Sequence, residues 1–348
     1  MLPTTIPLIL DVDTGIDDSL ALLYACASAE ADLLAVTCSA GNVEARQVVE
    51  NTLAVLELAG RSDIEVALGR EAPLERDLVT TPETHGPRGI GWAELPAPGA
   101  FVSPRHSADL IVEEARRRAG EIVLVALAPL TNVALAVRRE PELPRLLRRL
   151  VIMGGAYRAP GNTTPVSEWN VHVDPEAARA VFSAWAEAVE RDAGVVLPLA
   201  LGLDVTERAK LLPGHLARLG DGAGTDGAAV EARVRSADAP APGNAVLRFV
   251  ADALRFYMEF HARYDGFYGA FIHDPFVVAV ALDEALARSV PLAVDVELAG
   301  EITTGQTVAD WRGLWARKAN ADVAVEGDAS QFLERLIERV GALAAGVG

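Results

Sequence analysis

Cysteine is scarce in this chain, and long apolar runs are absent. Two cysteines, Cys26 and Cys38, occur among 348 residues, and such a pair in a large acidic chain indicates reduced core thiols rather than a disulfide. No apolar run approaches the length of a membrane span, and no basic region with a cleavage site precedes the first strand. The sequence also contains no internal repeat. These absences predict a cytoplasmic protein.

Positive charge is also in short supply. Lys and Arg total 31 against 49 Asp and Glu, which gives a formal net charge of −18. Nucleic acid and anionic membranes would repel a chain this acidic, so neither is an expected partner. A small ligand that is weakly charged or cationic fits the composition better.

Apolar runs and helical patterns alternate along most of the chain. Strands are expected at 6–11, 32–38, 64–68, 121–127, 149–153 and 194–200, with short ones near 290–297 and 320–325. Helices are expected at 43–59, 105–118, 174–189 and 328–344. This alternation is typical of βαβ units. It predicts an α/β fold, an open and mostly parallel sheet with helices on both faces, as a single domain with insertions over 1–348.

Two segments fall outside this alternation. Residues 70–104 contain six prolines and several glycines, a composition that predicts a mobile loop able to fold over a ligand. Residues 221–243 are rich in Gly, Ala, Asp and Pro and show no apolar period. That segment is predicted to be a flexible surface insertion.

The first apolar run leads directly into four aspartates, Asp11, Asp13, Asp17 and Asp18. Alternation along a strand puts Asp11 and Asp13 on one face. Gly15 then supplies a turn, and Asp17 and Asp18 open a helical pattern. Four like charges so close would repel one another unless a cation lay among them, and carboxylate oxygens suit Ca²⁺ or Mg²⁺. An ordinary helix start explains Asp17 and Asp18 but leaves Asp11 and Asp13 without a role.

Polar residues follow other apolar runs as well, where ligands of open α/β sheets bind. They are Gly41-Asn42, Pro129-Leu130-Thr131-Asn132, Gly154-Gly155 and the loop from Asn162 to Asn170. Each has an ordinary explanation as a helix cap, a turn or a loop residue. Together they place amides, carboxylates and a hydroxyl at one edge of the sheet, which would suit a polyhydroxylated ligand.

A late helix is predicted to start near His273-Asp274-Pro275, with Pro275 in its first turn and an acidic residue as candidate cap. Asp274 would add another oxygen ligand to the predicted cation site. His273, taken alone, is equally compatible with an ordinary packed histidine.

With these motifs in place, the chain resembles the inosine-uridine-preferring nucleoside hydrolases, a family of Ca²⁺-dependent N-ribohydrolases, over nearly its whole length. The most specific part is Asp11-Val-Asp13-Thr-Gly15-Ile-Asp17-Asp18, and the other motifs follow in the family's order. Thr14 stands where the commonest family version has proline, but this residue contributes turn geometry and no ligand. The resemblance implies hydrolysis of the N-glycosidic bond of ribonucleosides to free base and ribose.

The resemblance also implies residue roles. One Ca²⁺ would be bound by Asp13, Asp18, Asp274 and the backbone carbonyl of Thr131. The ion would bind the two vicinal ribose hydroxyls, Asp17 and Asn170 would hold the 2′ and 3′ hydroxyls, and Asn162 and Glu168 would reach the 5′ hydroxyl. Asn42 and Met153 would line the ribose site, and Asp274 would belong to the substrate site as well. Relatives are commonly dimers or tetramers, which implies a homodimer or homotetramer.

Cleaving this bond builds positive charge on the ribose, which a carboxylate-lined pocket stabilises. Asp13, beside the predicted cation, is the candidate general base. His273, with an ordinary pKa of about 6.5, is the candidate donor to the leaving base. His85 and His273 resemble features of relatives that accept hypoxanthine and uracil, and Trp169 is a candidate for stacking on the base. Uridine or inosine is therefore expected to be cleaved faster than guanosine.

The aromatic residues that precede His273 are expected to form a flap over the pocket. They are Tyr257, Tyr264, Phe267 and Tyr268.

Two other functions remain open. A strand followed by Asp-x-Asp is also the nucleophile motif of haloacid dehalogenase-like phosphatases, with Asp11 as nucleophile. Against that function, Gly15 stands where the motif has Thr or Val, and the two lysines, Lys210 and Lys318, lie in no convincing phosphate-binding loop. The other alternative is a non-catalytic Ca²⁺-dependent protein that binds nucleosides or ribose, which would need neither a general base nor a leaving-group acid.

Overall fold

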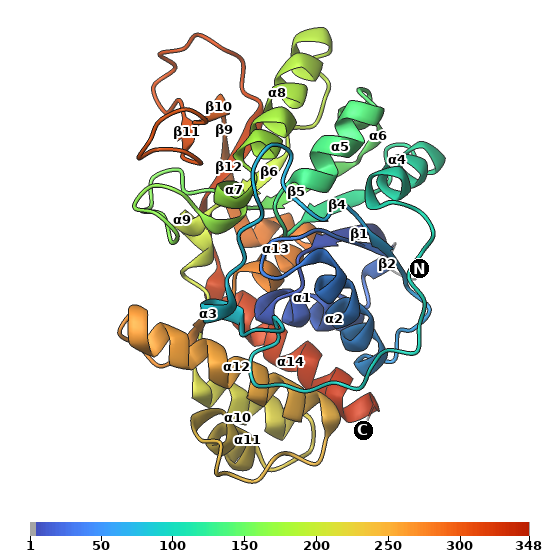
Figure 1. Ribbon diagram of the computed structural model, residues 1–348, viewed down its shortest axis with the longest axis vertical. Coiled ribbons are helices and arrows are strands. Elements are labelled where there is room, and N and C mark those ends of the chain that lie inside the picture. The colour runs from blue at the N-terminus through green and yellow to red at the C-terminus, as the bar shows by residue number, and fades with distance from the viewer. Residues whose placement is uncertain (1–4, 348) are drawn as a thin grey trace.

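An eight-stranded sheet forms the centre of the computed structural model, which describes residues 5–347 (Figure 1). Its strand order is β3-β2-β1-β4-β5-β6-β12-β9, and every neighbouring pair except β12 and β9 is parallel. Its strands are β1 (Ile6–Val12), β2 (Ala31–Cys38), β3 (Glu65–Leu68), β4 (Val123–Ala126), β5 (Arg149–Met153), β6 (Leu199–Leu201), β9 (Ala287–Leu292) and β12 (Ala321–Gly327). Two antiparallel pairs complete the strands, β7 (Lys210–Leu211) with β8 (Ala270–Phe271) and β10 (Val294–Val296) with β11 (Thr307–Ala309).

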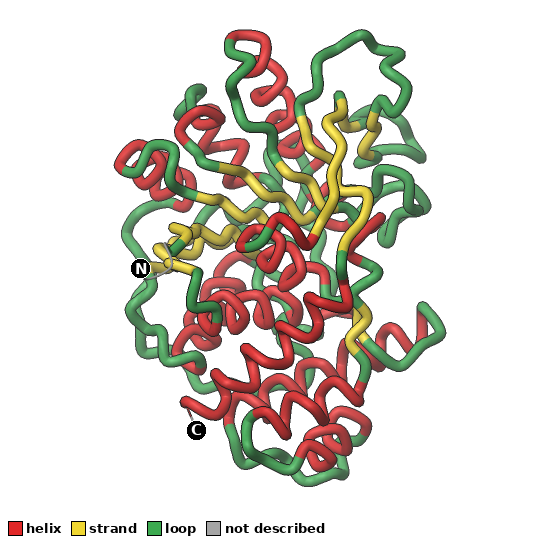
Figure 2. The backbone as a smooth tube through the Cα atoms, turned by 180° about the vertical axis from the view of Figure 1, so that it is seen from behind, coloured by secondary structure: helices red, strands yellow, loops and turns green. Residues whose placement is uncertain are grey.

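Helices cover both faces of the sheet (Figures 1 and 2). One face carries α1 (Ile16–Ala27), α2 (Ala45–Leu58), α13 (His273–Leu282) and α14 (Ala329–Val347). The other carries α4 (Ser107–Arg117), α5 (Thr131–Arg139), α6 (Leu143–Leu146) and α8 (Pro175–Arg191). A further layer beyond α14 consists of α10 (Pro213–Gly222), α11 (Gly227–Arg235) and α12 (Ala245–Tyr264). The short helices are α3 (Pro82–His85), α7 (Trp169–Val173), α9 (Leu203–Thr206) and the 3₁₀ helix η1 (Glu284–Leu286).

Strand β1 shows why the sheet lies at the core. Leu8 and Leu10 pack into the apolar cluster beneath α1 and α13, whereas Ile9 packs into the cluster beneath α4 and α5. Because successive side chains of a strand point to opposite faces, a continuous apolar run fits a strand that is covered on both sides. β1 pairs with β2 on one side and with β4 on the other, so the chain order reverses at this strand.

The predicted α/β architecture is confirmed, with local differences. The run expected as a strand at 194–200 forms only Leu199–Leu201. Residues 221–243, predicted to be a flexible surface insertion, contain α11, and their flexibility remains a prediction. The sequence did not predict this helix because its apolar pattern consists of only two valines. These are Val230 and Val234, which lie one helical turn apart and are both buried. Cys26 and Cys38 are free thiols, as expected.

Residues 70–104 contain one short helix, α3, and otherwise run as loop over the surface. Mobility of this segment remains a prediction. Among the described residues, no helix is both long and apolar enough to cross a lipid bilayer.

Phe332 of α14 gives a test of this packing. Its fully buried ring stacks on the ring of Phe276 of α13, with 4.9 Å between the ring centroids. It meets the ring of Tyr24 of α1 edge-on, with 6.1 Å between the centroids. Phe332→Ala should lower the free energy of unfolding by about 3–5 kcal/mol, because it leaves a cavity where three helices meet. Denaturant titration measures the change. The matched control is Phe101→Ala, whose ring is 92% exposed, with an expected change within about 0.5 kcal/mol. Equal losses in the two variants would contradict the packing argument.

Candidate active site

A cavity of about 550 Å³ opens beyond the carboxyl ends of the strands. It lies where β1 and β4 diverge in chain order, the position at which open α/β sheets bind ligands. The predicted site residues that line it are Asp13, Asp17, Asn42, His85, Met153, Asn162, Glu168, Trp169, Asn170, His273 and Asp274. Asp18 and Thr131 were also predicted and do not line it. The structure thus brings most of the predicted set together.

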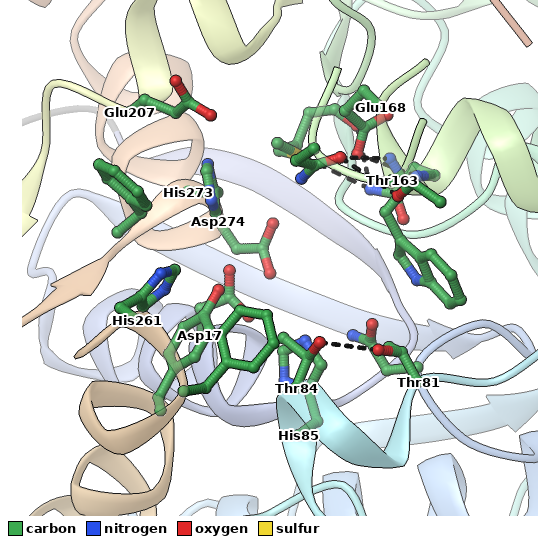
Figure 3. Close-up of a pocket in the computed structure, with 18 of the residues that line it drawn as sticks. Asp17, Thr81, Thr84, His85, Thr163, Glu168, Glu207, His261, His273 and Asp274 are labelled. Carbon is green, nitrogen blue, oxygen red and sulfur yellow. Dashed lines mark hydrogen bonds between the residues drawn. The ribbon is translucent and has the colours of Figure 1, made fainter. Parts of the chain in front are cut away.

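Three carboxylates lie close together here, and two of them, Asp17 and Asp274, line the cavity. Asp17, Asp18 and Asp274 each offer an oxygen, and these oxygens lie within 4.8 Å of one another. Asp17 and Asp18 belong to the first turn of α1, and Asp274 belongs to the first turn of α13. Figure 3 shows the carboxylates of Asp17 and Asp274 pointing toward each other. The cap residue of α13 is Ile272, so the expectation that an acidic residue caps this helix is wrong.

Hydrogen bonds hold Asp18 in place. One oxygen accepts from the backbone N–H of Asp13 at 3.2 Å, and the other accepts from the N–H of Gly15 at 2.9 Å. The amide of Asn42 donates to that second oxygen at 3.2 Å. Asp18 is fully buried, so its carboxylate is fixed by the loop that joins β1 to α1.

Asp13 lines the cavity but lies outside the group of three carboxylates. Its Oδ2 accepts a hydrogen bond of 2.8 Å from the backbone N–H of Asn42, which holds the carboxylate toward the loop after β2. That loop must come very close, since a Cβ on Gly41 would lie 2.1 Å from Asp13 Oδ2. The structure therefore groups Asp17 with Asp18 and Asp274. The sequence analysis had instead placed Asp13 with Asp18 and Asp274. A ligand role for Asp13 remains a prediction.

Burial makes these carboxylates costly to ionise. Burial and, to a lesser degree, the neighbouring Asp18 raise the pKa of Asp17 to about 7. Burial also raises the pKa of Asp18 to about 6, and burial with mutual repulsion raises the pKa values of Asp13 and Asp274. Among the described residues that line the cavity, none is Lys or Arg. Hard oxygen ligands without a protein cation fit a divalent ion.

Thr131 begins α5 after the 127–130 loop that follows β4, and its hydroxyl donates to Asp174 at 2.7 Å. This side chain is therefore engaged outside the cavity. The ligand role predicted for its backbone carbonyl remains a prediction.

The 154–170 loop presents a second polar group to the cavity. Glu168 caps α7 and accepts from three backbone N–H groups at 2.9 to 3.1 Å, which orders its carboxylate. Asn170 donates to the carbonyl of Leu127 at 2.6 Å, and Asn162 accepts from the N–H of Trp169 at 3.0 Å. These contacts fix amide and carboxylate side chains across the cavity from the aspartates.

Hydrogen bonds orient the rings of the two predicted histidines. His85 Nδ1 accepts from the N–H of Ile16 at 3.1 Å, so the neutral ring carries its proton on Nε2. His273 Nδ1 lies 2.8 Å from the hydroxyl of Thr206, which itself donates to the carbonyl of Gly202 at 3.2 Å. The contact with Thr206 fixes the orientation of the His273 ring. Burial lowers the pKa of each histidine to about 3.

Asp11 does not face the cavity. It is fully buried, and its Oδ1 accepts from Thr37 at 2.6 Å and from Asn132 at 2.9 Å. A carboxylate enclosed in this way cannot attack a phosphate in the cavity. The structure therefore opposes the phosphatase alternative, in which Asp11 is the nucleophile.

Sequence reasoning missed part of the cavity wall. Glu207, His261, Asp265 and Phe271 line it, but they belong to no motif that distinguishes them from other surface or core residues. Of the predicted aromatic flap, Tyr257 and Tyr264 line the cavity and Phe267 and Tyr268 do not. Tyr268 instead donates to the carbonyl of Val234 at 2.6 Å.

Comparison with known proteins agrees with this geometry. The family model described as inosine-uridine preferring nucleoside hydrolase matches residues 8–334. The pyrimidine-specific ribonucleoside hydrolase RihA of Enterobacter sp. (strain 638) is 39% identical over 336 residues, covering 96% of this chain and 97% of the relative. The solved structure of a purine-preferring ribonucleoside hydrolase from Gardnerella vaginalis has a TM-score of 0.85 at 29% identity, covering 97% and 99% of the two chains. A plant nucleoside hydrolase, PpNRh1, has a TM-score of 0.83 at 29% identity, covering 98% and 99%.

The raised pKa values predict a pH-dependent response to Ca²⁺. In a chelator the folded chain keeps protons on Asp17 and Asp18 that the unfolded chain has lost, so the free energy of unfolding should fall as pH rises from about 4 to about 7. Bound Ca²⁺ replaces those protons. The melting temperature should therefore increase more with Ca²⁺ at about pH 7.5 than at about pH 5.

Differential scanning calorimetry at the two pH values, with Ca²⁺ or with chelator, measures this response. Asp18→Asn should remove most of the Ca²⁺-dependent increase. A melting temperature that Ca²⁺ leaves unchanged at both pH values would contradict the assignment of a cation site.

Proposed function

The chain belongs to the inosine-uridine preferring nucleoside hydrolase family and is a hydrolase of ribonucleosides, and from this premise we propose how its cavity performs the reaction. The observation that carries the proposal is the grouping of Asp17, Asp18 and Asp274, two of which line the same cavity as the ordered amides of the 154–170 loop. Carboxylates suit a cation and a developing positive charge, and amides suit sugar hydroxyls.

We propose that the carboxylates hold one Ca²⁺. Asp18, Asp274 and Asp13, with the Thr131 carbonyl, are the proposed ligands, and the grouping of Asp17 with Asp18 and Asp274 supports a site at this point. A bound divalent cation supplies positive charge that lowers the pKa of a neighbouring water and attracts the vicinal ribose hydroxyls.

The remaining polar side chains orient the ribose. Asp17 and Asn170 accept and donate hydrogen bonds at the 2′ and 3′ hydroxyls, while Asn162 and Glu168 hold the 5′ hydroxyl. Asn42 and Met153 complete the sugar subsite. Asp13 lines the cavity beside the cluster of Asp17, Asp18 and Asp274, and it removes the proton from the attacking water as the general base. The buried carboxylates stabilise the positive charge that builds on the ribose as the bond to the base breaks.

Departure of a neutral base requires a proton from the site. His273 is the proposed donor, and the contact of its Nδ1 with the Thr206 hydroxyl orients the ring for this step. His85 carries a proton on Nε2 and supports this step by donating a hydrogen bond to the base. Trp169 lines the cavity and is proposed to stack on the base.

Cytoplasmic location and a homodimer or homotetramer remain part of the proposal. Neither nucleic acid nor a membrane is proposed as a partner, because the formal net charge is −18.

The central experiment incubates the protein with a nucleoside panel, with and without a chelator, and measures free base and ribose by chromatography. Wild-type protein should release base in Ca²⁺ and lose this activity in chelator. Asp13→Asn should lower kcat by about 10²-fold or more while the fold survives, because the attacking water loses its base. Asp238→Asn, at an exposed aspartate, is the matched control. Near-normal turnover in Asp13→Asn would refute the assigned base.

Base preference is a separate prediction. The RihA relative is described as pyrimidine-specific and the Gardnerella relative as purine-preferring, and the greater identity to RihA supports uridine. Initial rates of base release should be higher for uridine or inosine than for guanosine. The measurement compares uridine, cytidine, inosine and guanosine at equal concentration, and guanosine as the fastest substrate would overturn this preference.

A further inference from the structure

Two buried aspartates that have no part in the proposed reaction anchor the start of α5. Asp11 lies in β1 and Asp174 caps α8, and both are fully buried. Asp11 Oδ1 accepts a hydrogen bond of 2.9 Å from the amide of Asn132, and Asp174 Oδ2 accepts one of 2.7 Å from the hydroxyl of Thr131. The first two residues of α5 are thus each tied to a carboxylate from a different element.

The side-chain amide of Asn132 connects the ends of three strands. Besides Asp11 of β1, its Nδ2 donates to the carbonyl of Cys38, the last residue of β2, at 3.0 Å. Its Oδ1 accepts from the backbone N–H of Arg70, in the loop after β3, at 3.2 Å. The packing here is close, since a Cβ on Gly69 would lie 2.1 Å from Asn132 Oδ1. Rotation of this side chain would therefore break several hydrogen bonds at once.

Asp174 is itself fixed by backbone hydrogen bonds. Its Oδ1 accepts from the N–H of Ala177 at 3.0 Å, which caps α8, and its Oδ2 accepts from the N–H of Leu74 at 2.8 Å. Helix α8 packs beside α5 (Figure 1). The Thr131 hydroxyl therefore meets a carboxylate that other elements hold in place.

A single peptide group lies between these two anchors. It joins Thr131 to Asn132 and carries the Thr131 carbonyl, which the proposed function assigns to the cation. A peptide group is planar, and neighbouring side chains of a helix point in different directions. Anchoring both flanking residues therefore sets the direction of the carbonyl. Because a neutral carbonyl attracts a cation less strongly than a carboxylate does, its contribution to binding depends on being oriented in advance.

We propose that Asp11 and Asp174 are positioning residues of the metal site, which act through Asn132 and Thr131 to hold the Thr131 carbonyl in one direction for the cation. The inference rests on the proposed function, because it takes the cation site from there. It gives Asp11 a role that is neither ligand nor nucleophile, which agrees with its position outside the cavity. Loss of a residue that orients a metal ligand typically weakens metal binding by about 10- to 100-fold.

The first test measures the affinity for Ca²⁺ by isothermal titration calorimetry, after dialysis against a chelator, in wild type, Thr131→Val and Thr131→Ser. Valine keeps the shape of the side chain but cannot donate to Asp174, so the dissociation constant for Ca²⁺ should increase at least about tenfold. Serine keeps the hydroxyl, and its dissociation constant should stay within about threefold of the wild-type value. Wild-type affinity in Thr131→Val, or an equal loss in both variants, would overturn the proposal.

The second test reaches the same peptide group from its other side. Asn132→Ala removes the link to Asp11 and should also raise the dissociation constant for Ca²⁺ at least about tenfold. The control is Ser28→Ala, which removes a buried hydroxyl at the far end of α1 that donates to the carbonyl of Tyr24 at 2.7 Å. Its affinity for Ca²⁺ should equal that of wild type. A loss as large as in Asn132→Ala would overturn the proposal, because any buried hydrogen bond would then have this effect.

Melting curves in chelator distinguish positioning from a purely structural role. A purely structural role would lower the melting temperature without the cation and leave the Ca²⁺ affinity of the folded protein unchanged. A positioning role lowers the Ca²⁺ affinity of variants that are folded at the temperature of the titration.

The outcomes also separate the two proposals. Wild-type protein that binds no Ca²⁺ overturns the cation site of the proposed function, and this inference with it. Wild-type protein that binds Ca²⁺ no more tightly than Thr131→Val and Asn132→Ala overturns this inference alone.

Discussion

Several buried carboxylates lie close together beside a cavity that, among the described residues, no Lys or Arg lines, and this constraint governs the rest of the structure. Asp17, Asp18 and Asp274 each place a carboxylate oxygen within 4.8 Å of the other two, and each residue is almost fully buried. Bringing like charges together in a low-dielectric site is unfavourable. The fold accepts this cost at the point where its strands diverge, and it surrounds Asp18 with backbone N–H donors. Bound protons or a bound cation would stabilise such an arrangement. In the proposed reaction the cation takes this place.

The sheet creates this constraint by its order of strands. Because β1 and β2 are neighbouring parallel strands, the loops that follow them lie side by side beyond the ends of the strands. Gly41 allows the second loop to approach Asp13 within hydrogen-bonding distance. Asp274 reaches the same place from α13, whose first turn points at the cavity. The site is thus a product of topology as much as of side-chain chemistry.

Sequence analysis predicted the parts of the site that local patterns encode. The first strand, the aspartates after it and the polar loop from Asn162 to Asn170 all have periodicity or composition that reveals them. Glu207 and His261 could not be predicted, because they reach the cavity only through tertiary packing. Helix α9 packs against α13, and α12 packs against α3. The grouping of Asp17 rather than Asp13 with Asp274 also depends on side-chain direction, which spacing does not specify.

Asp17 and Asp18 belong to the first helix of the chain, and Asp274 to the thirteenth. During synthesis on the ribosome, the early aspartates leave the exit tunnel long before their partner exists. A nascent chain therefore has no complete ion site until most of its sheet has been assembled. Completion of this carboxylate group would come late in folding, and an unfinished polypeptide could neither bind the proposed cation nor act on ribonucleosides.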